Sequence, residues 1–268
     1  MTRLFHLLAA TALCALTTVQ PPAASAADIL PLDKLQQSIT KRFANRKPAR
    51  WGENVPGVST RLDTSERVVA LTLDACGSPK GTGADRSLIE FLVREQIPAT
   101  LFINYRWISA NQELFRQLSG NPLFEIANHG YSHKPASVNG RSAYGIGGTR
   151  DIRELVEEIE TNSRAIEARS GTRPRLYRSG TAYYDEVAVE IAAALGHQVA
   201  GYSVLGDAGA TYSASQVTAA LLRSRPGDII LCHMNHPASG TGAGIMAAVP
   251  ELKKRGFRFV RMSDYPLK

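Results

Sequence analysis

From residue 67 onward, short apolar runs alternate with longer amphipathic segments, and this alternation restricts the possible folds more than any other feature of the sequence. The apolar runs predict strands at residues 67–73, 98–104, 123–128, 175–178, 198–204, 228–233 and 258–262. Strands buried on both faces of a parallel sheet are nearly continuous in apolar residues, and helices connect them. We therefore predict an α/β fold: a distorted (β/α) barrel of about seven parallel strands in a single domain, with an open doubly wound sheet as the alternative.

The size and charge of the chain are compatible with one such domain. Its 268 residues, of which 44% are hydrophobic, suit one large core better than two. The formal net charge of +7 favours anionic partners such as a cell-wall polymer or an acidic polysaccharide, although solubility alone explains it equally well. No nucleic-acid recognition motif accompanies the basic residues, so we expect no nucleic-acid partner. Nothing in the sequence fixes the oligomeric state.

The residues before 67 divide into two segments. Residues 1–26 contain Arg3, an apolar run and a small-residue ending, which together predict a secretory signal peptide and export to the periplasm or the extracellular space. The apolar run is shorter than the roughly 20 residues needed to cross a bilayer, so no membrane span is expected. Residues 27–66 predict an N-terminal extension with one short helix and a basic loop, and residues 67–268 form the main domain.

Polar residues with chemical capability follow five of the seven predicted strands. In parallel α/β folds, ligands bind at the carboxyl ends of the strands, where structural polar residues have no special reason to gather. The residues at these ends are Asp74, His129 with His133, Arg178, Asp207 and His233. The sequence therefore predicts a functional site at this end of the sheet.

The stretch EIANHGYSH places His129 and His133 four residues apart, directly after an apolar run. This spacing allows both imidazoles to face one point, and neutral imidazole is a good ligand for zinc and similar divalent ions. An HxxxH pattern alone is weak support for a metal site. The polar residues at the other strand ends strengthen the interpretation.

These motifs resemble the polysaccharide deacetylase family, whose members carry the NodB homology domain. The family's T-F-D-D-G-P motif is similar to TLDACG at 72–77, and its H-x-x-x-H motif is matched by His129 and His133. Its arginine-containing and aspartate-containing motifs are similar to 177–185 and 202–209, and its final L-x-H motif is matched at 231–233. The resemblance covers residues 67–265, and the histidine motifs are its most specific part.

The resemblance implies a metal-dependent hydrolase that removes N-acetyl groups from a polysaccharide or oligosaccharide, with a divalent metal that is usually zinc. By this resemblance, His129 and His133 match the family's metal ligands. Asp74 matches the catalytic base or a further ligand, and His233 matches the catalytic acid. Arg178 orients the base, and Asp207 tunes His233. The main alternative is a catalytically degenerate glycan-binding protein on the same fold. The sequence does not identify the glycan.

One departure from the family pattern affects the metal site. The family's second aspartate, normally a metal ligand, is replaced by Ala75. Either Asp74 ligates the metal, or water or another side chain such as Asp85 fills the position, although Asp85 also suits a helix N-cap. Gly180 and Thr181 replace a proline and an aromatic residue of the third motif, which leaves its backbone oxyanion donor undefined.

Two cysteines and one histidine near the predicted site have several interpretations. Cys76 and Cys232 are either two small buried apolar residues or the two halves of a disulfide. A third alternative concerns Cys76 alone, as a replacement metal ligand or a nucleophile. Cys232 should point to the face of its strand opposite His233. His236 is a hydrogen-bonding neighbour or a contact to substrate or metal. The glycine-rich segment 139–148 is expected at the rim of a sugar cleft rather than around a phosphate.

Overall fold

The computed structural model describes residues 30–78 and 80–268, and the compact unit Leu32–Lys268 is described here by itself. The predicted signal peptide at 1–26 lies outside the described residues. The strands are β1 (Val58–Ser59), β2 (Val68–Ala75), β3 (Ala99–Ile103), β4 (Phe124–Asn128), β5 (Leu176–Tyr177), β6 (Gln198–Ala200), β7 (Val204–Leu205), β8 (Asp228–His233) and β9 (Arg258–Val260). The helices are α1 (Leu32–Phe43), α2 (Arg86–Arg94), α3 (Tyr105–Ala110), α4 (Gln112–Ser119), α5 (Ile152–Ser170), α6 (Glu186–Ala194), α7 (Ala214–Leu221), α8 (Thr241–Lys254) and the 3-10 helix η2 (Met262–Asp264).

All named strands form one parallel sheet in the order β1-β6-β5-β4-β3-β2-β8-β7, with β9 also paired to β2. Strands β3 to β6 add successively on one side of β2, and the late strand β8 returns to its other side. This is the order of a sheet that curls toward a barrel. All seven predicted strands are present, and the fold is the predicted distorted (β/α) barrel rather than the doubly wound alternative.

Side chains of β2 alternate between two apolar clusters, as the period of two along a strand requires. Leu71, Leu73 and Ala75 face outward into a large cluster shared with α2, α3, α4, α7 and α8. Val68 and Ala70 face inward, where they meet residues of β3, β4, β5, β6, β8 and β9 in the barrel interior. The interior near the amino ends of the strands is therefore filled by apolar side chains.

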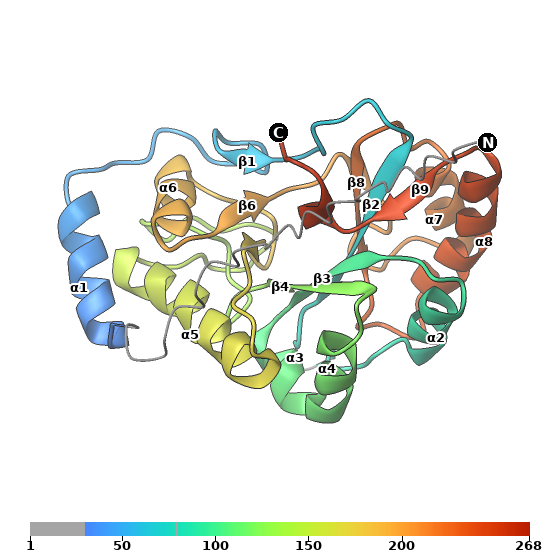
Figure 1. Ribbon diagram of the computed structural model, residues 1–268. Helices are drawn as coiled ribbons and strands as arrows, with labels where there is room; N and C mark the ends of the chain where they lie inside the picture. The colour runs from blue at the N-terminus through green and yellow to red at the C-terminus, as the bar shows by residue number, and fades with distance from the viewer. Residues whose placement is uncertain (1–29, 79) are drawn as a thin grey trace, which may run out of the picture. The chain divides into compact units, whose positions relative to one another are not determined.

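The predicted N-terminal extension is part of the same compact unit as the barrel. Helix α1 is the short helix predicted for this segment, and Ile39 and Phe43 are buried against α5 and α6. Figure 1 shows this helix, in blue, beside α5. The chain then continues to β1, which pairs with β6. Within residues 30–78 and 80–268, no helix is both long enough and apolar enough to cross a membrane.

Candidate active site

The alternation along the strands carries the predicted polar residues to the inner face of the barrel. Asp74 lies four residues after the inward-facing Ala70 and therefore on the same side of β2. The same relation holds near the ends of three other strands, where an even number of positions separates an interior apolar residue from a polar one. These pairs are Ala127 and His129, Leu176 and Arg178, and Ile229 and His233. The site is thus built on the apolar interior at the carboxyl ends of the strands.

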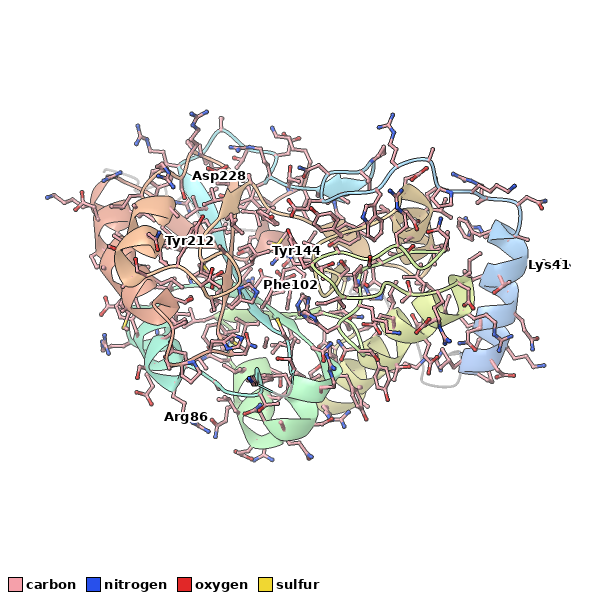
Figure 2. The ribbon with its side chains drawn as sticks, turned by 180° about the vertical axis from the view of Figure 1, so that it is seen from behind. Lys41, Arg86, Phe102, Tyr144, Tyr212 and Asp228 are labelled. Atoms are coloured by element: carbon pink, nitrogen blue, oxygen red, sulfur yellow. The ribbon has the colours of Figure 1, made fainter. Side chains whose placement is uncertain are left out.

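Arg178 and Asp74 form a buried ion pair. The Arg178 Nη1 donates to Asp74 Oδ1 at 2.7 Å and to the Thr72 hydroxyl at 2.8 Å. The rest of the guanidinium donates to the carbonyl oxygens of Ala200 and Gly201 and lies over the Phe102 ring. Phe102 is labelled in Figure 2. Because all three nitrogens of the guanidinium donate hydrogen bonds, its position relative to the Asp74 carboxylate is fixed.

His129 is oriented by a backbone carbonyl. Its Nδ1 lies 2.9 Å from the carbonyl oxygen of Arg178, and because a carbonyl can only accept, Nδ1 carries the proton. The Nε2 of the neutral ring then keeps its lone pair. This Nε2 lies 3.7 Å from Cys76 Sγ and 3.7 Å from Asp74 Oδ2. Such a ring is prepared to act as a metal ligand, since a hydrogen bond at the other nitrogen fixes its tautomer.

His133 lies on a loop that is held by a buried carboxylate. Glu158 of α5 is 2% exposed and accepts backbone N–H groups from Ser132 and Lys134, on either side of His133. His133 itself has a φ of 61°, an uncommon conformation for a non-glycine residue. Among the described residues, its buried Nε2 has no hydrogen-bond partner. A buried polar atom without a partner is costly unless a ligand satisfies it.

Cys76, His129 and His133 form a group in which one potential ligand atom from each residue lies within 4.8 Å of the others. The two imidazole rings meet edge to face, with centroids 4.9 Å apart. Burial opposes ionisation of the Cys76 thiol, but His133, His129 and His233 outweigh it and hold its pKa well below the usual range. The cysteine is therefore electrostatically suited to carry a negative charge beside the histidines.

His233 and Asp207 form a second buried pair. The Nδ1 of His233 lies 2.9 Å from Asp207 Oδ1, and the other carboxylate oxygen accepts the His233 backbone N–H and the Thr241 hydroxyl. Burial alone would lower the pKa of His233, but the bond to Asp207, together with the nearby Cys76, outweighs it and the pKa is raised well above the usual value. This histidine is therefore held in the protonated form that a general acid needs.

These groups open into one cavity of about 670 Å³. Its lining includes Asp74, Cys76, His133, His233 and His236. Tyr144 and Ile146 of the glycine-rich segment line the same cavity, and Tyr144, labelled in Figure 2, is 72% exposed. The segment 139–148 therefore borders the cleft as predicted.

Several alternatives from the sequence are decided by the structure. Asp85 is the N-cap of α2, where its side chain accepts the Leu88 N–H at 3.0 Å, and it is not part of the histidine group. Cys76 and Cys232 are both free, so the disulfide alternative is wrong. Cys232 points outward into the apolar cluster, opposite His233, as predicted. Gly180 and Thr181, which replace the proline and the aromatic residue of the family's third motif, also line the cavity.

Two residues of the site carry no recognisable sequence signal. Glu158 lies in the middle of a long amphipathic helix, where a glutamate is normally solvated. Glu53, from the N-terminal extension, lines the cavity and accepts hydrogen bonds from the Tyr202 and Tyr144 hydroxyls at 2.9 and 3.0 Å. The extension therefore contributes directly to the wall of the cleft.

Comparisons with known proteins agree with this architecture. A family model described as polysaccharide deacetylase matches residues 61–200. The peptidoglycan-N-acetylglucosamine deacetylase of Bacillus cereus is 25% identical over 211 residues, which cover 77% of this chain and 92% of that protein. A crystal structure of a peptidoglycan N-acetylglucosamine deacetylase has a TM-score of 0.66 at 21% identity, covering 78% of this chain and 92% of that one. A CE4 family pseudoenzyme from Bacillus anthracis has a TM-score of 0.64 at 18% identity, covering 87% and 80%.

The fold and the family model together define the class of this protein, a family of carbohydrate-modifying hydrolases. The chain belongs to the polysaccharide deacetylase family, as its motifs predict. The residues of the site fit the divalent metal that this family implies. His129 has a fixed tautomer, and the buried Nε2 of His133 has no partner among the described residues. A third potential donor, Cys76, lies beside them.

Proposed function

We propose that the protein is an exported, metal-dependent deacetylase that removes N-acetyl groups from a glycan, with zinc as the metal and N-acetylglucosamine units of peptidoglycan as the first substrate to test. The supporting observation is the convergence of an arginine-held carboxylate, a histidine group and an aspartate-held histidine in one cavity. The name of the Bacillus cereus relative supports the choice of glycan. The signal-like segment at 1–26 supports export.

Asp74 is the proposed base. Arg178 holds one carboxylate oxygen at 2.7 Å and leaves Asp74 in the wall of the cavity, where it can take a proton from the attacking water. His129 and His133 would hold the metal, with Asp74 or Cys76 beside them. A divalent ion at this position would act as a Lewis acid toward the acetyl carbonyl and would increase the acidity of water.

His233 is the proposed acid. Amines leave poorly unless they are protonated, so cleavage of an amide needs a proton donor as well as a base. Asp207 occupies Nδ1 of His233, which leaves Nε2 as the nitrogen available to the cavity. Asp207 also stabilises the charge of the imidazolium, and Thr241 and the His233 backbone fix the carboxylate. The pair thus supplies a proton to the departing amine from a defined direction.

A glycan-binding protein without catalytic activity is the second candidate. The replacement of the family's second aspartate by Ala75 favours it, as does the similarity in fold to a pseudoenzyme. The two candidates differ in metal binding and turnover. Stoichiometric zinc binding with acetate release supports the enzyme, whereas glycan binding without either supports the binding protein.

Acetate release from N-acetylglucosamine oligomers and from peptidoglycan tests the proposal. The wild type should release acetate after zinc is added and lose this activity with a chelator. His129→Ala should lose both zinc binding and activity, while Asp74→Asn should reduce kcat by about 10²–10⁴-fold, the usual contribution of a general base. Asp63→Asn, at an exposed ion pair with Lys268, is the matched control. A wild type that binds zinc but releases no acetate from any N-acetylated glycan contradicts the proposal.

A further inference from the structure

We propose that the Cys76 thiolate is the third protein ligand of the metal, so that this chain has a Cys-His-His centre in place of the aspartate-containing set of its family. The inference rests on the metal site of the proposed function but concerns a separate property, the ligand set. It also identifies which side chain takes over the role that Ala75 cannot perform.

The direction of the strand explains why residue 76, and not residue 75, serves this role. Ala75 is the last residue of β2, and its side chain is fully buried in the outward-facing cluster with Leu71 and Leu73. A carboxylate at this position would enter apolar packing, away from the histidines. Cys76 follows on the inner side, the same side as Asp74, and lines the cavity.

The loop after Cys76 keeps the thiol close to the histidines. Gly77 has a φ of 66°, and a Cβ on it would lie only 2.5 Å from the backbone nitrogen of Trp107. Its N–H donates to the carbonyl of Gly81, which fixes the backbone directly after the cysteine. Position 77 needs glycine for both its conformation and its close contact with α3. The position of Cys76 is therefore fixed by strand β2 before it and by Gly77 after it.

The separation between Cys76 and His129 fits a tetrahedral metal site. Zinc–sulfur bonds of about 2.3 Å and zinc–nitrogen bonds of about 2.05 Å place sulfur and nitrogen about 3.6 Å apart at the tetrahedral angle. The observed separation between Cys76 Sγ and His129 Nε2 is 3.7 Å. His133 Nε2 is buried and, among the described residues, has no hydrogen-bond partner. Three potential ligands are thus present, which leaves one coordination position for water or substrate.

This ligand set separates two roles that would otherwise compete for one carboxylate. If Cys76 binds the metal, Asp74 need not do so and remains available as the base, held by Arg178. Thiolate and imidazole ligands also favour zinc and cobalt over magnesium and manganese, which prefer oxygen. The chain should therefore discriminate between these ions more strongly than a site with an aspartate ligand.

Cobalt(II) spectroscopy tests the ligand directly, because a sulfur–cobalt bond gives a near-ultraviolet charge-transfer band. We expect the band in the cobalt-loaded wild type and in Cys232→Ser, the matched control for a buried cysteine. Cys76→Ser should lack the band and bind zinc at least tenfold more weakly, since even residues outside the ligand shell contribute about 10–100-fold. Cys76→Asp should bind metal without the band and accept manganese more readily. Circular dichroism establishes that each variant is folded.

The proposal is overturned if the wild type binds cobalt without the band, if it binds no cobalt, or if Cys76→Ser keeps the band. These outcomes are distinct from those that test the deacetylase. A protein with the band but without acetate release keeps the Cys-His-His centre and loses the proposed activity. Metal-dependent acetate release without the band keeps the activity and eliminates the thiolate ligand.

Discussion

Asp207 contacts His233 twice, once through the imidazole and once through the backbone. One carboxylate oxygen lies 2.9 Å from Nδ1 and the other accepts the backbone N–H at 2.7 Å. The residues are 26 positions apart in sequence. A carboxylate so placed fixes both the position of the ring and the nitrogen that carries the proton toward the cavity.

The pH dependence of activity should change in Asp207→Asn. In the wild type, burial opposes protonation of His233, but the bond to Asp207, with a further contribution from Cys76, outweighs it and raises the pKa. A general acid with a raised pKa stays protonated to higher pH, so activity should be lost only as pH rises through that value. Without the carboxylate the pKa falls, and the alkaline limb of the kcat profile should move to lower pH. Thr241→Val, which removes only the hydroxyl bond to Asp207, should move it less. An unchanged limb in Asp207→Asn contradicts this role of Asp207.

Glu158→Gln should weaken metal binding without altering any proposed ligand. Its carboxylate accepts the N–H groups of Ser132 and Lys134, and an amide can replace only part of this arrangement. We expect a loss of about 1–3 kcal/mol of stability, the usual cost of a buried unsatisfied group, and about 10–100-fold weaker zinc binding. Thermal unfolding and zinc titration measure the two effects. Glu157→Gln, at the adjacent exposed position, should change neither. Equal zinc affinity in Glu158→Gln and wild type would show that the loop does not depend on this carboxylate.

His197 should make the protein less stable in acid. Burial, together with the nearby Arg173, lowers the pKa of this 2% exposed histidine to about 3. Because the unfolded chain has the ordinary value near 6.5, it binds more protons than the folded protein between about pH 6.5 and 3. The stabilising effect is complete above pH 6.5 and is lost as pH falls, by up to about 1.4 kcal/mol per pH unit. The free energy of unfolding, measured with urea at a series of pH values, should fall less steeply with decreasing pH in His197→Gln than in the wild type. The same slope in both proteins would exclude this histidine as the cause.

Tyr144 should affect substrate binding more than the chemical step. Its side chain lines the cleft, lies edge to face against Tyr183 at 5.3 Å and donates to Glu53. An exposed aromatic ring beside a cleft provides an apolar surface with a polar end for a sugar. Tyr144→Ala should raise KM for long oligomers several-fold with little change in kcat, and Tyr144→Phe should have a smaller effect. A large loss of kcat with unchanged KM would place Tyr144 in the chemistry instead.

The local sequence determined the elements of the fold and most of the chemically capable residues. Apolar runs predicted the strands because burial on both faces of a sheet requires them, and the period of two then set which side of β2 Asp74 occupies. The spacing of His129 and His133 and the motif around His233 identified the family. The tertiary structure was needed where distant segments meet. Glu158 reaches the His133 loop from α5, and Glu53 reaches the cleft from the extension.

The position of the cysteine was also decided only by the tertiary structure. From the sequence alone, Ala75 marks a missing ligand, and Cys76 is a small buried residue, half of a disulfide, or a replacement ligand or nucleophile. Which of two adjacent side chains faces the histidines depends on where β2 ends and how tightly the chain turns at Gly77 against α3. Neighbouring residues on a strand point to opposite faces, so a difference of one position separates the apolar cluster from the cavity.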